Sequence, residues 1–279
     1  MKCAWNEFLA ILPSRLRREV DNLGREQLEE LRLRQGQPVE LVLYRDSKVL
    51  SAVATQEDLS CIVNAASRYS PWSASTASQG YITAPGGHRI GLCGECVIQN
   101  GQITGLRTVT SLCIRVARSF SGIARNAPTS GSLLILGPPG AGKTTLLREL
   151  VRTRSEKGVT VAVVDERGEL FSNHQIFESG PRTDILTGCS KAQGVQMALR
   201  TMGPKCIAVD EITAQEDCQA LIGAGWCGVE LLATAHAANT RDLFSRPVYR
   251  PLAGSGLFQQ ALVLDRDKSW HMERMEVCT

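Results

Sequence analysis

The chain has 279 residues, of which 43% are hydrophobic and 21% charged, and its formal net charge is +3 at pH 7. This length favours two domains rather than one, and the apolar content excludes a chain that is disordered throughout. A charge so close to balance is only weak evidence for an acidic partner.

Residues 1–7 lack a charged region followed by an apolar core, so we expect no export signal. We therefore expect a cytoplasmic protein. The most apolar window, residues 220–238, includes Glu230 and His236. We predict that it does not cross a membrane and that the chain is not inserted in one.

The first 55 or so residues predict helices followed by a hairpin. Residues 7–34 have helical spacing that is broken at Pro13 and Gly24, which predicts two short helices. Residues 39–44 and 48–53 have strand character with a turn between them. They predict two antiparallel strands.

The next segments complete a small α+β domain. Residues 56–69 return to helical spacing, and residues 81–118 are glycine-rich strands and turns. Asn100-Gly101 is typical of a tight hairpin turn. A polar stretch follows, and we place the boundary near residue 125, which gives an N-terminal domain of residues 1–125.

This glycine-rich region contains Cys93 and Cys96, with His88 five residues upstream of Cys93. Two thiolates at this spacing can bind a metal or form a redox pair. The sequence has no second cysteine pair nearby to complete a zinc site, and the segment has strand character. We therefore predict neither function, and we expect most of the ten cysteines to be reduced and structural.

Residues 126–279 predict an α/β domain, because short apolar strands alternate with helices. Such a series is typical of a mostly parallel sheet. Two further strands are predicted at residues 257–264 and 270–277. The preceding elements are strand 132–136, helix 143–157, strand 160–165, helix 191–201, strand 206–210, helix 216–224 and strand 230–234.

A phosphate-binding loop lies between the first of these strands and the first helix. The segment matches G-x-x-x-x-G-K-[ST], and its strand–loop–helix setting is the context that this motif requires. Its backbone N–H groups and the helix N-terminus favour phosphate. We predict that ATP is bound by Gly137, Pro138, Pro139, Gly140, Ala141, Gly142, Lys143, Thr144 and Thr145.

Within this loop Lys143 is expected to reach the β- and γ-phosphates and Thr144 to ligate Mg²⁺. Asp210 and Glu211 end a buried strand at the edge of the sheet where ligands bind. We predict that Asp210 supports the magnesium ion and that Glu211 orients the attacking water. The next strand ends near Thr234 and His236, and either of these two residues is a candidate γ-phosphate contact.

Two other classes of P-loop protein are excluded by missing signatures. The sequence contains no Asn-Lys-x-Asp guanine reader, which a GTPase would have, and no Leu-Ser-Gly-Gly-Gln segment, which an ABC ATPase would have. An ATPase of another type is therefore predicted.

The whole chain resembles the stage III sporulation protein AA family, mother-cell ATPases of endospore-forming bacteria that are related to type II and type IV secretion ATPases. The resemblance depends on collinear motifs spread over both domains. They are residues 31–34 with Pro38, 79–91, 165–169, 182–186, 188–191, 198–200, 210–212, 234–236 and 246–247.

The resemblance implies a RecA-like P-loop core with a mostly parallel sheet, preceded by a smaller α+β domain. It places Glu166 in an acidic box and His236 in a histidine box, both near the nucleotide. It further implies a homo-oligomer in the form of a hexameric ring, located in the mother-cell cytoplasm. This ring is expected to associate peripherally with membrane proteins of a sporulation channel complex and to drive assembly or transport.

The source of an arginine that stabilises the γ-phosphate is left open by the sequence. Secretion ATPases carry an arginine soon after the second acidic motif, where this chain has Thr213-Ala214. We expect a neighbouring subunit to supply it. The candidates are Arg107, Arg115, Arg182 and Arg200.

Two alternatives to a secretion-type motor also remain open. One is an ATPase stimulated by nucleic acid, favoured by the arginine-rich residues 15–18 and 115–118. We expect no nucleic-acid partner, because such arginines more often form a solvated face. The other is a scaffold that binds ATP with little turnover.

Overall fold

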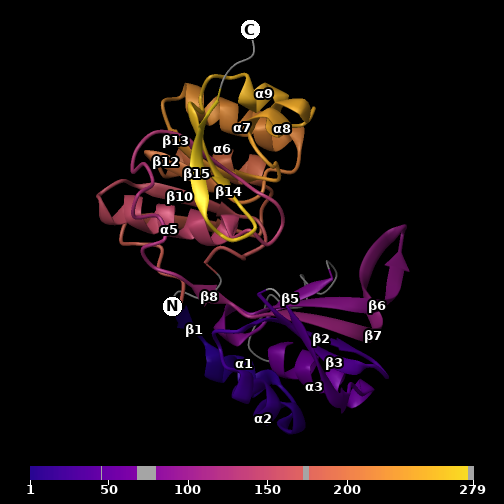
Figure 1. Ribbon diagram of the computed structural model, residues 1–279. Coiled ribbons are helices and arrows are strands. Elements are labelled where there is room, and N and C mark those ends of the chain that lie inside the picture. Colours follow the sequence, from indigo (N-terminus) through magenta and orange to yellow (C-terminus); the bar gives the residue numbers. More distant parts are fainter. Residues whose placement is uncertain (45, 68–79, 172–175, 276–279) are drawn as a thin grey trace. The chain divides into compact units, whose positions relative to one another are not determined.

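The computed structural model describes residues 1–44, 46–67, 80–171 and 176–275 (Figure 1). The chain divides into two compact units, Met1–Ser119 and Phe120–Thr279.

The first unit is built on an antiparallel sheet with the strand order β4-β3-β2-β7-β6-β5, six strands among the described residues. The helices are α1 (Trp5–Ile11), α2 (Ser14–Leu23), α3 (Gln56–Ser67) and the 3₁₀ turn η1 (Pro85–Gly87). The strands are β1 (Lys2–Cys3), β2 (Leu28–Arg34), β3 (Pro38–Leu43), β4 (Ser47–Val53), β5 (Tyr81–Thr83), β6 (Arg89–Gln99), β7 (Gln102–Arg115) and β8 (Arg118–Ser119).

Most of the elements predicted for this unit are confirmed, and residues 28–34 are the exception. They form strand β2, although helical spacing was expected to continue to residue 34. Leu31 and Leu33 are buried in the core while Arg32 is only partly buried. Burial of every second residue is the period of a strand. Leu28 obscures this period in the sequence because it lies three residues before Leu31, which is a helical spacing, and the strand register shifts between Leu28 and Glu30.

The predicted hairpin turn at Asn100 and Gly101 is confirmed, and it joins β6 to β7. Asn100 has φ of 52° and Gly101 has φ of 76°. Positive φ at both central residues is the requirement of a type I′ turn, which explains the Asn-Gly pair.

The second unit is an α/β unit whose strand order is β11-β10-β12-β13-β9-β14-β15, seven strands in the described part of the chain. Only β15 runs antiparallel to its neighbour. The strands are β9 (Leu133–Leu136), β10 (Val161–Asp165), β11 (Thr183–Thr187), β12 (Cys206–Val209), β13 (Glu230–Ala235), β14 (Gln260–Leu264) and β15 (Trp270–Arg274). The helices are α5 (Lys143–Glu156), α6 (Lys191–Thr201), α7 (Gln215–Trp226), α8 (Thr240–Ser245) and α9 (Arg250–Ala253).

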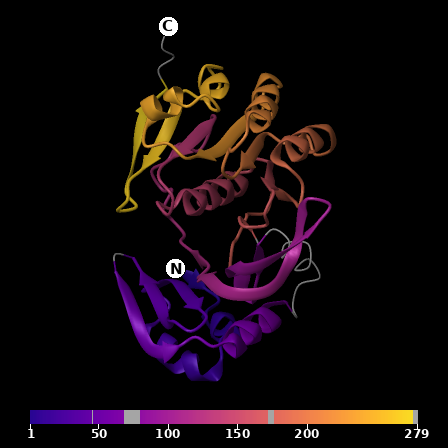
Figure 2. The ribbon, with the colours of Figure 1, turned by 90° about the vertical axis from the view of Figure 1, so that its right-hand side faces the viewer.

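Helices cover both faces of this sheet. The chain crosses the sheet in one direction from β9 to β11, with α5 between β9 and β10, and returns in the other direction from β11 to β13, with α6 and α7 between these strands. Because such crossovers are right-handed, α5 lies on one face of the sheet and α6 and α7 lie on the other. Strands β14 and β15, yellow in Figure 2, lie at one edge. Because the strands other than β15 run parallel, their carboxyl ends lie at one edge of the sheet, where α5 begins.

All predicted elements of this unit are present, and β11, α8 and α9 were not predicted. Strand β11 lies at the sheet edge and none of its five residues is fully buried. It therefore lacks the apolar run of an inner strand. The last residues of the final predicted strand, 276–277, lie outside the described residues.

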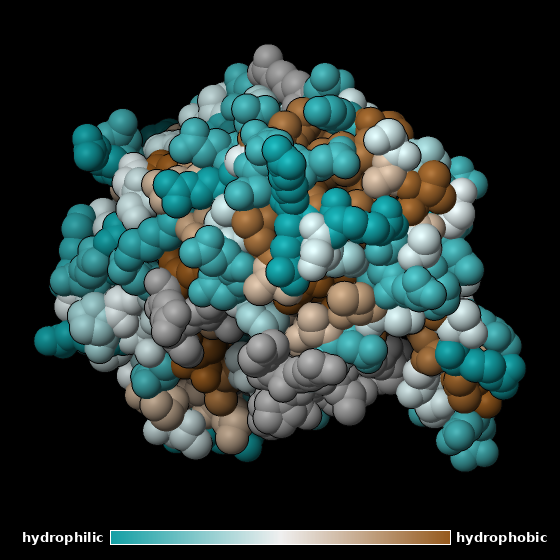
Figure 3. All heavy atoms as spheres, turned by 90° about the horizontal axis from the view of Figure 1, so that it is seen from below, coloured by the Kyte–Doolittle hydropathy of each residue, from teal (hydrophilic) through white to brown (hydrophobic). Residues whose placement is uncertain are grey.

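The surface carries hydrophobic side chains in separate areas among hydrophilic ones, as the face in Figure 3 shows. Helices that combine the length and apolarity needed to cross a bilayer are not found in the described ranges.

Candidate functional site

The predicted phosphate-binding loop follows the fully buried strand β9 and leads into α5. Gly140 and Gly142 have φ of 77° and 101°, a conformation that other residues rarely adopt. A Cβ atom at Gly137 would lie 2.9 Å from the carbonyl oxygen of Leu264. The loop thus requires glycine for its turns and for its close approach to β14.

Lys143, the first residue of α5, folds back over this loop. It is only 7% exposed, and its Nζ donates to the carbonyl oxygens of Gly137 and Pro138, each at 2.9 Å. A third contact, at 3.0 Å, joins Nζ to Nδ1 of His236. Burial lowers the pKa of the Lys143 ammonium.

Asp210, directly after β12, forms hydrogen bonds with residues from two neighbouring elements. Its Oδ2 accepts from Thr144 Oγ1 at 3.0 Å. Its Oδ1 accepts from Thr234 Oγ1 at 2.8 Å. A carboxylate and a hydroxyl oxygen in contact are hard ligands of the kind that Mg²⁺ prefers, so Thr144 and Asp210 fit the predicted magnesium site.

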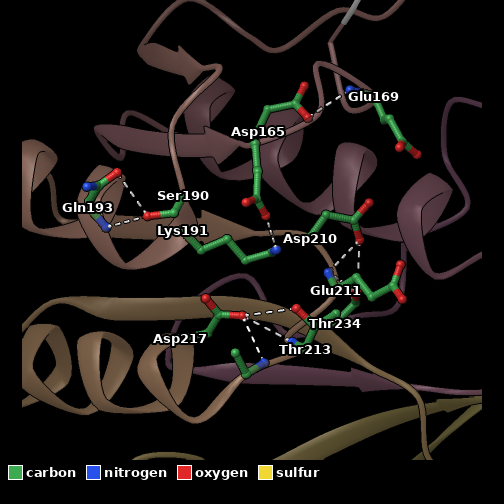
Figure 4. A network of polar contacts seen from close by, with 12 residues as sticks. Asp165, Glu169, Ser190, Lys191, Gln193, Asp210, Glu211, Thr213, Asp217 and Thr234 are labelled. Carbon is green, nitrogen blue, oxygen red and sulfur yellow. Dashed lines mark hydrogen bonds and ion pairs between the residues drawn. The ribbon is translucent and has the colours of Figure 1, made fainter. Parts of the chain in front are cut away.

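Glu211 has an unusual backbone conformation, with φ of 40°. Its N–H donates to Asp210 Oδ1 at 3.0 Å and to Thr234 Oγ1 at 2.8 Å (Figure 4). The N–H of Ile212 donates to the carbonyl oxygen of Thr234 at 2.9 Å. The left-handed conformation costs about 1–2 kcal/mol, and the hydrogen bonds that fully buried Thr234 accepts from the Glu211 and Ile212 N–H groups hold it in place.

His236 connects Lys143 to Glu211. Its Nε2 lies 3.1 Å from Glu211 Oε1. Because an ammonium can only donate, Nδ1 accepts from Lys143, and Nε2–H donates to the Glu211 carboxylate. The orientation of Glu211 is therefore linked to the phosphate-binding loop through one imidazole ring.

Glu166 lies at an open pocket of about 330 Å³ that it shares with Asp210 and Glu211. Its Oε2 accepts from Lys191 Nζ at 2.5 Å. The structure thus brings the predicted acidic-box residue to the same edge of the sheet as the other candidate residues. The pocket is lined by Asp165, Glu166, Arg167, Glu169, Lys191, Asp210, Glu211 and Thr213.

Asp165 and Arg148 support this edge, and no role was predicted for either residue from the sequence. Asp165 accepts hydrogen bonds from the N–H groups of Glu169, Leu170 and Phe171. Burial raises the pKa of its carboxyl. Burial also lowers the pKa of Arg148, to about 10. Asp165 was visible as the first residue of an acidic run, whereas nothing in the local sequence distinguished Arg148.

The four candidate arginines lie at different places, two in each unit. Arg182 donates to the carbonyl oxygen of Gly158 at 3.3 Å. Within the first unit, Arg107 pairs with Glu95 and Arg115 with Glu30. Arg200 lies in the last turn of α6. Their proposed role in a neighbouring subunit's site stays a prediction.

The cysteine pair and His88 occupy different environments. His88 is fully buried, accepts a hydrogen bond from the Ala117 N–H at Nδ1, and contacts the Ala4 carbonyl oxygen through Nε2. Burial lowers its pKa to about 4. Cys93 and Cys96 are exposed on β6. No group of three or more His, Cys, Asp or Glu side chains that could hold a metal ion occurs in the described parts of the chain.

Replacing Cys93 and Cys96 together by serine is expected to leave ATP turnover within about twofold of wild type. Both side chains are exposed on a strand of the first unit, where a serine fits without repacking. Steady-state assays check the turnover, and elemental analysis checks that purified protein carries no stoichiometric zinc. About one zinc per chain would contradict this prediction.

Comparison with known proteins identifies relatives along nearly the whole chain. The family model described as "Sporulation stage III, protein AA" matches residues 4–273. Stage III sporulation protein AA of Bacillus subtilis (strain 168) is 37% identical over 286 residues, which cover 94% of this chain and 92% of that protein.

Solved structures of an ATPase and of a pilus motor share the fold at low sequence identity. The X-ray structure of the Legionella pneumophila ATPase DotB is 17% identical with a TM-score of 0.58, covering 94% of this chain and 80% of that one. The pilus retraction motor PilT with bound ADP is 15% identical with a TM-score of 0.56, covering 88% and 76%. These likenesses show a P-loop ATPase fold. Because the family match spans both units, the chain belongs to the sporulation stage III protein AA family, as its motifs predicted.

Proposed function

We propose that this protein binds and hydrolyses ATP as an oligomeric motor of the secretion-ATPase type. The observation that carries the proposal is the contact between the phosphate-binding loop and the acidic strand end. Thr144 Oγ1 donates to Asp210 at 3.0 Å, and Glu211 is fixed beside Asp210 in a left-handed conformation. The fold shared with DotB and PilT supports it.

The residues present suit a magnesium-bound nucleotide. The glycine loop offers backbone N–H groups at the N-terminus of α5, and Lys143 adds a buried positive charge. Thr144 and Asp210 would hold Mg²⁺, which would neutralise phosphate charge when bound. Glu211 would orient a water molecule and take its proton.

His236 and Glu166 would act next to this centre. The imidazole of His236 keeps the Glu211 carboxylate oriented through its Nε2–H, at 3.1 Å. When Lys143 turns from the loop carbonyls toward phosphate, Nδ1 of His236 loses its donor. The orientation of the Glu211 carboxylate would then depend, through the ring, on whether Lys143 contacts the loop or the phosphate. Glu166 would contribute to the water network from the same pocket.

The oligomeric state, location and partners that we propose for this motor are inferred from its family. The Bacillus subtilis relative is named as a stage III sporulation protein. We infer a homo-oligomer, in the form of a hexameric ring, in the mother-cell cytoplasm. It would associate peripherally with membrane proteins of a sporulation channel and drive assembly or transport, without a nucleic-acid partner.

ATP turnover per chain is expected to rise with protein concentration, because a neighbouring subunit completes the site. Trans-acting arginines contribute about 10³–10⁵ in rate in other nucleotidases. Turnover is measured over a dilution series, with sedimentation to follow assembly. No turnover at any concentration would contradict the proposed hydrolysis, and full turnover by a monomer would contradict the shared site. Stimulation by DNA or RNA would instead support the nucleic-acid alternative.

Mixed oligomers provide the matched control. Alanine variants of Arg107, Arg115, Arg182 and Arg200 are each combined with Glu211→Gln protein. The variant that removes the trans arginine should recover turnover in the mixture, since some interfaces then combine an intact arginine with an intact Glu211. Recovery with none of the four would exclude all of them from this role.

A further inference from the structure

Lys191 reaches the candidate site from an element that does not carry any of the predicted nucleotide contacts. It is the first residue of α6 and follows the unpredicted strand β11. The residue is only 7% exposed, and its Nζ lies 2.5 Å from Glu166 Oε2. In Figure 4 its side chain extends toward the edge of the sheet where Asp210 and Glu211 lie.

Helix stability does not explain a lysine at this position. The first turn of a helix has a positive partial charge, which disfavours an ammonium group. Ser190 already caps α6 by accepting from the Gln193 N–H, and burial of Lys191 adds a desolvation cost. Its partner carboxylate is 37% exposed, so the ion pair offsets little of that cost.

The charges around the pocket indicate that Lys191 orients the Glu166 carboxylate. Five carboxylates line this pocket and only two cations do, of which Arg167 is exposed and Lys191 is buried. Carboxylates held close together repel one another. Without the Lys191 ammonium, the Glu166 side chain would turn away from Asp210 and Glu211 toward solvent.

The backbone at Glu166 is already fixed, so Lys191 determines only where the side chain points. Asp165, the preceding residue, binds three backbone N–H groups of the following turn. The remaining freedom of Glu166 is the rotation of its own side chain. The contact at 2.5 Å with a buried partner restricts that rotation and favours the orientation toward Lys191.

We propose that Lys191 is a positioning residue that holds the Glu166 carboxylate in the orientation needed for turnover. The proposal rests on the proposed ATP hydrolysis, and it assigns Lys191 no direct contact with ATP. Lys191→Met should therefore lower kcat about tenfold or more, since small misplacements of a catalytic group have effects of this size. The KM for ATP should change by less than about twofold, because the binding loop is intact.

The experiment compares Lys191→Met, Lys191→Arg, Glu166→Gln and the double variant Lys191→Met/Glu166→Gln with wild type. Lys191→Arg should restore most of the lost kcat, because a guanidinium can still pair with Glu166. The double variant should be no slower than Glu166→Gln alone, because both changes remove one interaction. Lys205→Met, at an exposed position, is the control, and thermal unfolding of each variant verifies folding.

Wild-type kcat in Lys191→Met would overturn the proposal. Failure of Lys191→Arg to restore kcat, or additive losses of kcat in the double variant, would also overturn it. A rise in KM without a fall in kcat would also overturn it, because Lys191 would then bind nucleotide directly. Absence of hydrolysis in wild type would refute the proposed function itself, and this inference with it. The two failures are therefore distinguishable.

Discussion

Glu211→Gln is expected to stop ATP turnover while ATP binding remains. Glutamine cannot take a proton from water, and loss of a general base typically lowers kcat about 10²–10⁴-fold. The backbone N–H of residue 211 would still donate to Asp210 and Thr234, and the amide oxygen can accept from His236. The proposed magnesium ligands and the proposed phosphate-binding loop are therefore unchanged.

The measurement separates binding from chemistry. A fluorescent ATP analogue should bind the variant with a Kd close to that of wild type, while phosphate release falls to the background rate. Glu216→Gln, on an exposed position of α7, removes one carboxylate from the same region and should retain full turnover. Unchanged phosphate release by Glu211→Gln would remove Glu211 from the water-orienting role.

Lys143→Ala is expected to weaken ATP binding itself. The site otherwise consists of backbone dipoles, and Lys143 supplies the buried positive charge above them. Truncating one partner of a buried charge pair costs about 2–5 kcal/mol. This corresponds to a Kd at least roughly 30-fold higher. Turnover should fall as well, because the positive charge expected to face the β- and γ-phosphates is lost.

Titration of nucleotide with and without Mg²⁺ checks this prediction. Lys157→Ala, an exposed lysine at the other end of α5, is the matched control and should bind like wild type. Equal affinity in Lys143→Ala and Lys157→Ala would contradict the assignment of residues 137–145 as the nucleotide-binding loop.

The sequence by itself determined the features that are encoded over short distances. The phosphate-binding loop is one contiguous motif between an apolar strand and a helix, so its place in the fold could be derived from spacing alone. The parallel sheet followed from apolar strands alternating with helices, and the Asn100-Gly101 turn followed from the positive φ that it requires. Family membership followed from collinear motifs, and the comparison confirms it.

Sequence patterns failed where one local signal fits two structures. The leucines at 28 and 31 are spaced as on a helix, yet the segment is strand β2 because pairing with β3 and β7 buries alternate residues. Strand β11 has no apolar run, because an edge strand needs none. In both cases the partners that decide the conformation are distant in the chain.

Only the tertiary structure decided how the candidate residues act on one another. Thr234 lies under the turn of Asp210 and Glu211 because β12 and β13 are neighbours in the sheet. Lys191 reaches Glu166 because β10 and β11 are paired, so that residues 25 positions apart leave the same edge. Strand order brings such side chains within hydrogen-bonding distance, and strand order is a property of long-range packing that no local spacing encodes.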